Sequence, residues 1–206
     1  MMTQSVAART TGSYRDVLRV SMPLVISMTT TVVMTFTDRV FLANYSIDAI
    51  AAALPAGIIA FVFLVFFADT AGYTNVIIAQ YTGAGALQRV GSALWQAIYF
   101  AVIAWLIMVG LSFGAGPLFR LVGHSAEVQQ LEVIYFRVLC LGSGIHIIGM
   151  SLSSFFTGRG VTRPVMIIHI IAMLLNVPLD YTLINGIWIF PEMGILGAAI
   201  ATVFSW

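Results

Sequence analysis

The sequence contains no lysine and little charge of either sign. All nine basic residues are arginines, and charged residues make up only 8% of the 206 residues, against about 25% in an ordinary soluble domain. The missing lysine excludes a Walker A loop, because that loop needs its lysine on the nucleotide phosphates. A net charge of +1 argues against nucleic acid as a partner, since binding it needs a concentrated basic patch. We therefore expect energy to come from an ion gradient or a partner chain.

Cysteine is almost absent too. The one cysteine, Cys140, lies in an apolar run, so it cannot form an intrachain disulfide and is typical of a small buried hydrophobe. No CxxC or HExxH pattern occurs, which leaves a structural zinc site unsupported. No nucleophile–base spacing indicates catalysis. We expect a protein that is not an enzyme, has no cofactor and binds no metal ion other than Na⁺.

Hydrophobic residues, by contrast, make up 60% of the chain. A soluble domain cannot hide that many apolar side chains, because its surface-to-volume ratio is too large, whereas a lipid-facing surface can be apolar throughout. Segment 1–13 is polar, and the apolar stretch that follows is too long for a cleavable signal. The sequence thus predicts an all-α membrane protein with a cytoplasmic tail at 1–13 and a transmembrane bundle over 14–206.

About six stretches approach the roughly 20 apolar residues that a spanning helix needs. We place them at 17–45, 50–81, 90–113, 128–156, 164–187 and from 194 onward. The second is long enough to protrude from the bilayer or to be irregular. The polar segments between the stretches, including 114–130, are expected to be loops. The sixth stretch is still apolar at Trp206, so we expect it to be truncated at its cytoplasmic end.

The arginines predict the orientation of the bundle. Cytoplasmic loops of membrane proteins carry an excess of basic residues. In the six-span arrangement, Arg120 is the basic residue of the opposite loops. Six arginines fall on the side of the N-terminus: Arg9, Arg15, Arg19, Arg89, Arg159 and Arg163. We therefore expect a cytoplasmic N-terminus and a multi-pass protein of the plasma membrane, which in bacteria is the inner membrane.

Ionisable residues inside a span are costly and usually functional. Asp38 follows Arg19 by 19 residues, or roughly 28 Å along a helix, which places it in the outer half of the membrane. Its neighbour Arg39 is not expected to share its face, because consecutive helical residues point in different directions. The alternative for Asp38 is an interfacial carboxylate that is paired locally.

A second polar pair lies in the fifth span. Asn176 and Asp180 are four residues apart and so lie on one helix face. Pro178 between them removes one backbone hydrogen bond and frees the Leu174 carbonyl. A carboxylate, an amide oxygen and a free carbonyl suit a hard cation such as Na⁺, or a proton held between acceptors. The alternative is a pair that only packs two helices together.

Thr202 lies about 12 Å into the sixth span from its outer end. Asp38, Asn176, Asp180 and Thr202 are therefore expected at a similar depth, where three helices supply oxygens to one cation site. Thr202 alone is a weak indication, because threonine often bonds its own backbone.

Four further residues have secondary roles in this interpretation. Tyr135, Arg137 and Gln80 are candidates for lining a wet cavity, and Pro23, like Pro178, is a candidate for a helix kink.

At these residues the sequence resembles the N-terminal lobe of the multidrug and toxic compound extrusion (MATE) family. The matching stretches are Pro23 upstream of Thr37-Asp38, the run 41–46, the run 79–85 and the run 194–202. The most specific is Asn-Val-Pro-Leu-Asp-Tyr-Thr-Leu-Ile-Asn-Gly at 176–186. Together they cover nearly all the chain after Tyr14.

The resemblance implies one lobe of a twelve-helix, two-lobe antiporter. Such transporters exchange H⁺ or Na⁺ inward for organic, often cationic, compounds outward. The family's N-lobe cation site corresponds to Asp38, Asn176, Asp180 and Thr202, and a tyrosine of the fourth helix corresponds to Tyr135. The second lobe is missing from this sequence, so a C-terminal lobe is an expected partner beside the organic substrate and the lipid bilayer.

Two other readings remain open. A lipid-linked oligosaccharide flippase of the same superfamily lines its cavity with several cationic residues, for which Arg137 and Arg39 are the candidates here. A membrane fragment that does not transport is the second, because the sixth span stops without a polar flank.

Overall fold

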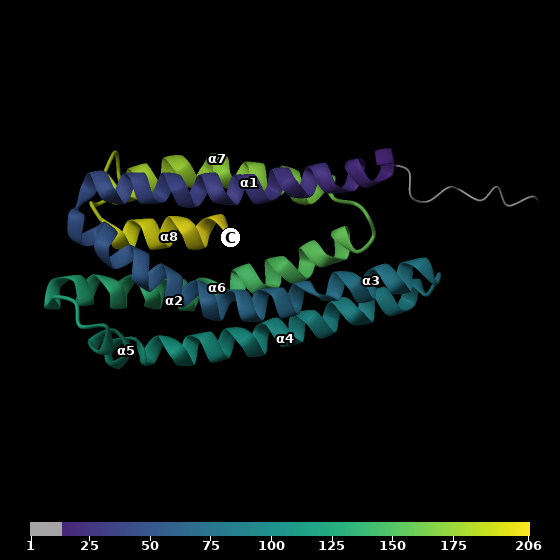
Figure 1. Cartoon of the computed structure of the whole chain (residues 1–206), viewed down its shortest axis with the longest axis horizontal. Helices are drawn as coiled ribbons and strands as arrows, with labels where there is room; N and C mark the ends of the chain where they lie inside the picture. The colour runs from purple at the N-terminus through teal and green to yellow at the C-terminus, as the bar shows by residue number, and fades with distance from the viewer. Residues whose placement is uncertain (1–13) are drawn as a thin grey trace, which may run out of the picture.

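The computed structural model describes residues 14–206, and the expected tail at 1–13 lies outside the described residues. Within them the chain forms α-helices and no strand. The helices are α1 (Tyr14–Tyr45), α2 (Ile47–Gly72), α3 (Thr74–Gly83), α4 (Leu87–Phe113), α5 (Ala115–Val122), α6 (Ala126–Thr157), α7 (Arg163–Asn185) and α8 (Ile195–Ser205). The long helices run along one axis of the molecule (Figure 1).

Five stretches are long and apolar enough to cross a membrane: α1, α2 with α3, α4, α6 and α7. Many of their apolar side chains, such as Met28 and Phe66, point away from the bundle and are exposed. The apolar α8 has 11 residues, fewer than the roughly 20 that span a bilayer. The chain is a multi-pass, all-α membrane protein, as its composition predicts.

The long second stretch is irregular, as its length suggested. The α-helix breaks at Tyr73, where α2 ends and α3 begins. The Tyr73 amide still donates to the Asp69 carbonyl over 2.8 Å, so the break costs little hydrogen bonding. The two helices together run from Ile47 to Gly83.

The expectation of a loop over 114–130 is wrong, because this segment contains α5 and the first turn of α6. Pro117 lies in the first turn of α5, where a proline removes no helical hydrogen bond. Phe119 is buried against Phe136 of α6, with ring centroids 5.6 Å apart. The polar residues that suggested a loop belong to the short turn after α5 and to the exposed side of α6.

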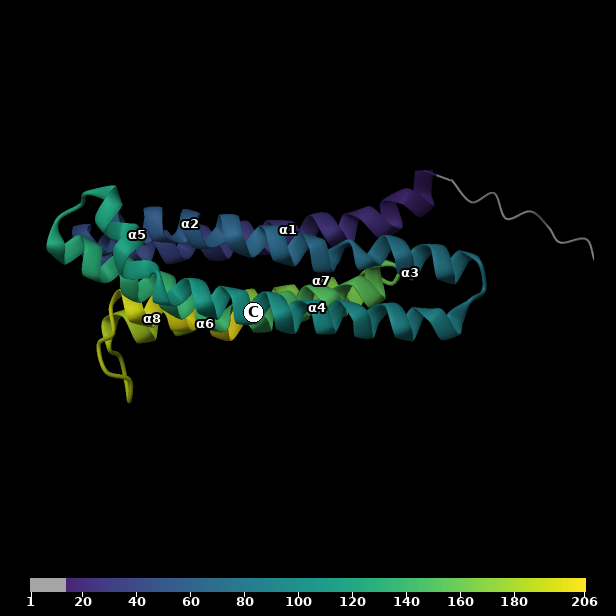
Figure 2. The same cartoon turned by 90° about the horizontal axis from the view of Figure 1, so that it is seen from below.

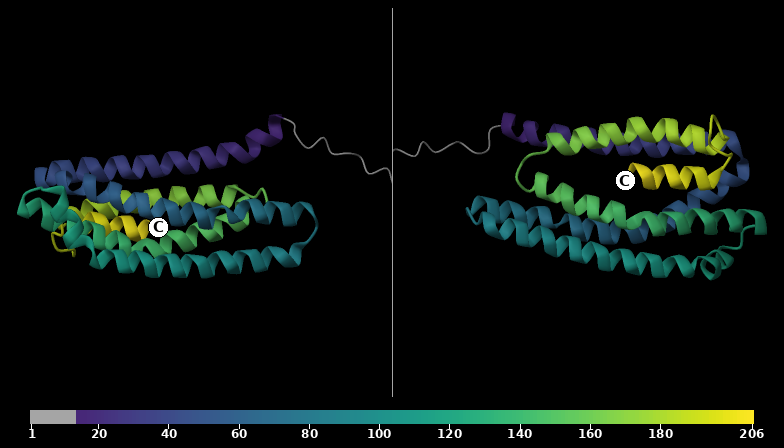
Figure 3. Two further views of the ribbon diagram at one scale, coloured as in Figure 1. Left: turned by 60° about the horizontal axis from the view of Figure 1, so that its bottom comes forward. Right: turned by 180° about the vertical axis from the view of Figure 1, so that it is seen from behind.

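The helices α1, α7 and α8 pack together on one side of the bundle, and α6 packs against α2, α4 and α8. Figures 1 and 3 show α8 lying between α7 and α6 in views from opposite sides. Figure 2 shows α4 beside α6 over much of its length. The central position of α6 brings its side chains into contact with helices from both ends of the sequence.

At one end of the bundle, the α7–α8 connection is tied to α1. The Tyr45 hydroxyl donates to Glu192 Oε1 over 2.9 Å. Gly194 has a positive φ of 51°, and a Cβ there would lie 2.7 Å from the Tyr45 ring. Glycine thus allows the connection to pass directly over the end of α1 and sets the position of α8.

Glycines let α6 approach its neighbours closely. A Cβ on Gly142 would clash with the Val203 side chain of α8, and a Cβ on Gly144 would lie 2.6 Å from Trp105 of α4. The Trp105 indole N–H donates to the Leu141 carbonyl over 2.8 Å. Membrane helices associate through such small residues and polar contacts, because burial of apolar surface provides little drive in lipid.

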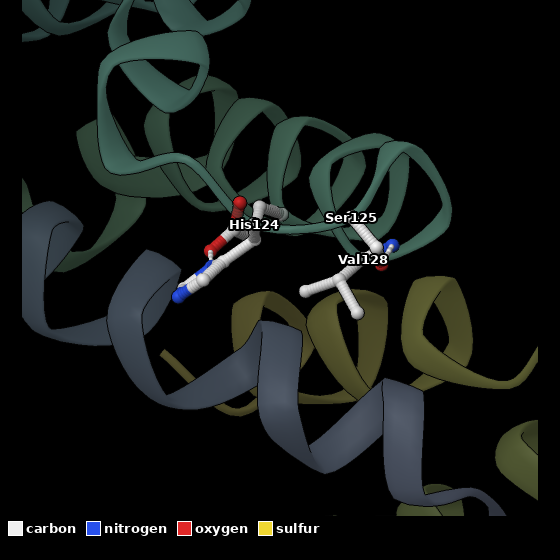
Figure 4. A network of polar contacts seen from close by, with 4 residues as sticks. His124, Ser125 and Val128 are labelled. Carbon is white, nitrogen blue, oxygen red and sulfur yellow. Dashed lines mark hydrogen bonds and ion pairs between the residues drawn. The ribbon is translucent and has the colours of Figure 1, made fainter.

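A buried acid lies near the α5–α6 turn. Glu132 on α6 is fully buried, and its Oε1 lies 2.7 Å from Nδ1 of His124, whose side chain is 40% exposed. Figure 4 shows His124 in the turn just before α6, beside Ser125, the N-cap residue, whose hydroxyl accepts from the Val128 amide. The second oxygen, Glu132 Oε2, has no hydrogen-bond partner within residues 14–206. His124 is therefore the one polar side chain bonded to this acid in the described part of the chain.

We predict that Gly144→Ala lowers stability by about 1–3 kcal/mol, because the added methyl overpacks the α4–α6 contact and displaces Trp105. The measurement is thermal unfolding of the purified protein in detergent. Gly110→Ala is the matched control, since a Cβ at Gly110 meets no atom within 4 Å. Equal melting temperatures for the two variants would contradict this account of the packing.

We predict that His124→Ala destabilises the protein by about 1–3 kcal/mol, because it leaves the buried Glu132 without its polar partner. The double variant His124→Ala/Glu132→Gln should recover part of this loss, since a neutral amide is cheaper to bury unpaired than a carboxylate. Denaturant unfolding of all three proteins checks this. A double variant less stable than His124→Ala would show that the pair is not the source of the effect.

Candidate functional site

The site is built where α1 lies along α7. Most of α1 is exposed, but Asp38 is only 5% exposed and Leu42, one turn later, is fully buried. These two residues mark the face of α1 that is turned into the bundle, because positions four apart share a helix face. Next to them, Phe41 packs on Tyr181 of α7 with ring centroids 5.4 Å apart. The contact fixes the register of the two helices at the level of Asp38.

Two further polar residues face inward from α7. Asn176 and Asp180 are 1% and 0% exposed, and the Asn176 amide lies beside the Asp180 carboxylate. Asp38 is the charged neighbour of Asp180. The structure thus brings together the carboxylates of the first and fifth predicted spans in the interior of the bundle.

Helix α8 reaches the same place because it packs tightly on α7. A Cβ on Gly197 would lie 2.6 Å from the Leu183 carbonyl, so only glycine permits this approach. Thr202 is half-buried, and its hydroxyl donates to the Ala198 carbonyl over 3.0 Å. Such a hydrogen bond to the backbone of its own helix is what makes threonine alone a weak indication of a site. The hydroxyl oxygen can still accept a hydrogen bond or contact a cation.

Tyr135 joins the group from α6. Its ring is buried, and its polar neighbours are Asp38, Asp180 and Thr202. Four helices therefore contribute to one group of oxygen-bearing side chains, which we call the oxygen cluster: Asp38, Tyr135, Asn176, Asp180 and Thr202.

Several oxygens of this cluster lack a donor. Oδ1 of Asp38, Oδ1 of Asn176 and both carboxylate oxygens of Asp180 are buried and accept no hydrogen bond from residues 14–206. An isolated ionised carboxylate in an apolar medium is very costly unless it is paired or neutralised. Carboxylate and amide oxygens are ligands that suit a hard cation, and they equally suit a proton. Residues 14–206 hold no group of three His, Cys, Asp or Glu residues, such as a transition-metal site needs.

The side chain of Arg39 reaches this region too, although the residue is not on the helix face of Asp38. Its guanidinium carbon lies 5.8 Å from the centre of the Tyr135 ring. A Cβ on Gly57 of α2 would lie 2.7 Å from its Nη2. Its backbone does point away from the face of Asp38, but a long side chain can carry its charge several ångströms from that direction. The spacing rule describes the direction of the Arg39 backbone, but it does not locate the end of so long a side chain.

The other secondary candidates lie elsewhere. Arg137 is exposed on α6, and its Nε donates to the Ser112 carbonyl of α4 over 3.3 Å. Gln80 is exposed on α3. Neither joins the oxygen cluster. Helices α1 and α7 continue through Pro23 and Pro178, and Thr182 donates to the Pro178 carbonyl over 2.8 Å.

Glu132 was not among the sequence candidates. It falls in the fourth predicted span, so the rule that singles out ionisable residues within spans could have found it. It lies just beyond the expected loop 114–130, at the end of that span, and its partner His124 lies within the loop range.

Comparison with known proteins gives consistent matches. The sequence model of the MatE family matches residues 23–182. A Thermotoga maritima protein named "Probable multidrug resistance protein NorM" is 33% identical over 170 residues, which are 82% of this chain and 36% of that protein. Multidrug resistance protein PmpM of Pseudomonas aeruginosa is 28% identical over 198 residues, or 94% of this chain and 41% of that protein.

A solved structure shares the fold. It is described as the outward-facing conformation of a multidrug resistance MATE family transporter, and it superimposes with a TM-score of 0.81 at 24% identity. The match covers 92% of this chain and 42% of that one. The chain thus spans about two fifths of the length of the proteins it matches, in their N-terminal half. With the family model matching most of its length, the chain belongs to the MatE family.

Proposed function

We propose that this chain forms the N-terminal lobe of a secondary antiporter that exports organic compounds in exchange for H⁺ or Na⁺. The names of NorM and PmpM support a multidrug substrate range. The observation that carries the proposal is the set of buried oxygens without donors on Asp38, Asn176 and Asp180. A purely structural polar cluster would pair these oxygens internally, because unsatisfied buried groups destabilise a fold.

Occupancy of the oxygen cluster changes the charge of the lobe interior. A proton or Na⁺ neutralises part of the charge on Asp38 and Asp180, and this lowers the cost of holding α1 and α7 together. An ion shifts a conformational equilibrium only through its different affinity for the two states. Other transporters that are built from repeats work by rocking of their two halves. The oxygen cluster couples the ion to such rocking if the distance between α1 and α7, and with it the affinity for the ion, differs between the two states.

The positions of the arginines support the antiporter over a lipid-linked oligosaccharide flippase. A flippase cavity needs several inward-facing cations. Arg137 lies on an exposed side of α6, which leaves Arg39 as the one arginine at the oxygen cluster among the described residues. The two carboxylates of the oxygen cluster favour binding of a cation over binding of an anionic compound.

The proposed location is the bacterial inner membrane, with the N-terminus in the cytoplasm. The turn α3–α4 and the connection α6–α7 lie at the end of the bundle where α1 begins (Figure 1). Arg159 lies in the α6–α7 connection, and Arg89 and Arg163 lie in the first turns of α4 and α7 beside these segments. Basic residues thus gather at one end, as the positive-inside rule requires.

We predict that Asp38→Asn or Asp180→Asn reduces ion-driven export by more than about tenfold in the complete protein that contains this chain, because the cluster loses a titratable or Na⁺-binding oxygen. The measurement is ethidium export from vesicles with an H⁺ gradient or a Na⁺ gradient imposed separately. Asp16→Asn is the matched control, since Asp16 is an exposed carboxylate on the same helix.

The same experiment names the coupling ion, because only the gradient that drives the wild-type protein loses its effect in the variants. Membrane insertion is measured in parallel by the yield of folded protein. Full export by both aspartate variants, at normal yield, would remove the proposed role of the oxygen cluster.

We predict the orientation by labelling single cysteines in a Cys140→Ala background. Gln88→Cys lies in the first turn of α4, next to the α3–α4 turn, and Ile189→Cys lies in the α7–α8 connection. Both native side chains are exposed. A membrane-impermeant maleimide should label Ile189→Cys on intact cells and Gln88→Cys only after permeabilisation. The reverse pattern would contradict a cytoplasmic N-terminus.

A further inference from the structure

We propose that Arg39 is a built-in cation of the oxygen cluster, whose charge balances one of the two carboxylates so that the site takes up a single monovalent cation. The inference rests on the proposed function, because it concerns the number of ions that the same site binds. Nothing in the family match assigns a role to this residue.

The guanidinium of Arg39 is held in place by two neighbouring helices. On the α6 side, its central carbon lies 5.8 Å from the centre of the Tyr135 ring, a distance at which a cation is attracted to the ring face. On the α2 side, Nη2 lies so close to Gly57 that a Cβ at that residue would be only 2.7 Å away. The absence of a side chain at Gly57 thus makes room for the charge inside the bundle.

Two acidic residues share the surroundings of Arg39. Asp38 is its neighbour on α1 and interacts with it electrostatically, and Asp180 faces the same tyrosine from α7. The remaining polar groups of the cluster, on α6, α7 and α8, are the neutral Tyr135, Asn176 and Thr202. Two carboxylates and one guanidinium leave a net charge of −1.

A net charge of −1 in a low-dielectric interior favours one added monovalent cation. Without Arg39, two carboxylates would face each other, and like charges in one buried site cannot both stay ionised without a counter-charge. With Arg39 present, one cation restores neutrality, and a second would create an excess positive charge. Nη1 of Arg39 is buried and has no acceptor within residues 14–206. It is therefore free to donate a hydrogen bond to the carboxylate that the bound ion does not contact.

The test counts ions in the complete purified protein in detergent. Bound Na⁺ is measured at saturation with ²²Na⁺, and bound protons are measured by potentiometric titration, with the Asp38→Asn/Asp180→Asn double variant as the baseline. We expect the wild-type protein and Arg39→Lys to bind about one cation above this baseline, and Arg39→Gln to bind about two. A purely structural role for Arg39 would change the yield or the melting temperature but not this count.

Gly57→Ala provides a second route that keeps the charge in the protein. Its methyl group must shift the end of the flexible Arg39 side chain, so we expect the ion count to rise in the same direction as in Arg39→Gln, by a smaller amount. Gly91→Ala is the matched control, because a Cβ there meets no atom within 4 Å, and its count should equal that of the wild type.

The outcomes separate the inference from the proposed function. If the aspartate double variant lowers ion binding but Arg39→Gln binds the same number of ions as the wild type, the inference is wrong and the proposed site stands. If the double variant and the wild type bind equally, both fail. A count that rises by one in Arg39→Gln and stays unchanged in Arg39→Lys supports the inference.

Discussion

The structure depends on the cost of placing two carboxylates inside a membrane bundle. Asp38 and Asp180 are buried, and three of their four oxygens receive no donor from residues 14–206. Lipid offers no water to compensate for this, so the surrounding helices must bring other charges and dipoles to the same point. Tyr135, Asn176, Thr202 and Arg39 gather there from α6, α7, α8 and α1. This accounts for the tight packing of α7 with both α1 and α8.

That packing in turn relies on residues without side chains. Gly197 lets α8 lie against the backbone of α7, Gly142 and Gly144 let α6 approach α8 and α4, and Gly57 leaves room for a guanidinium. Each glycine removes a Cβ at a contact between two helices. The glycines therefore set the distances between the helices, and these short distances bring the polar side chains together.

The sequence predicted most of the fold and of the oxygen cluster from local information. Hydropathy placed the long helices, and the spacing of Asn176 and Asp180 put them on one face, because both signals lie within single helices. It failed for α5, since an eight-residue helix held by Phe119 against Phe136 leaves no long apolar run. It did not locate the end of the Arg39 side chain or the pairing of Glu132, because these depend on Gly57 and His124 of other segments. Such contacts are visible only in three dimensions.

The pairing of α1 with α7 has a consequence for synthesis of the protein. Asp180 follows Asp38 by 142 residues, so a ribosome adding about 5–20 residues per second needs roughly 7–28 s to deliver it. During that interval α1 is already made, while its acidic face has neither α7 nor α8 to cover it. We therefore expect the nascent α1 to stay at the translocon or near the lipid–water boundary during this interval. It can take its final position in the bundle only after α7 and α8 have been synthesised.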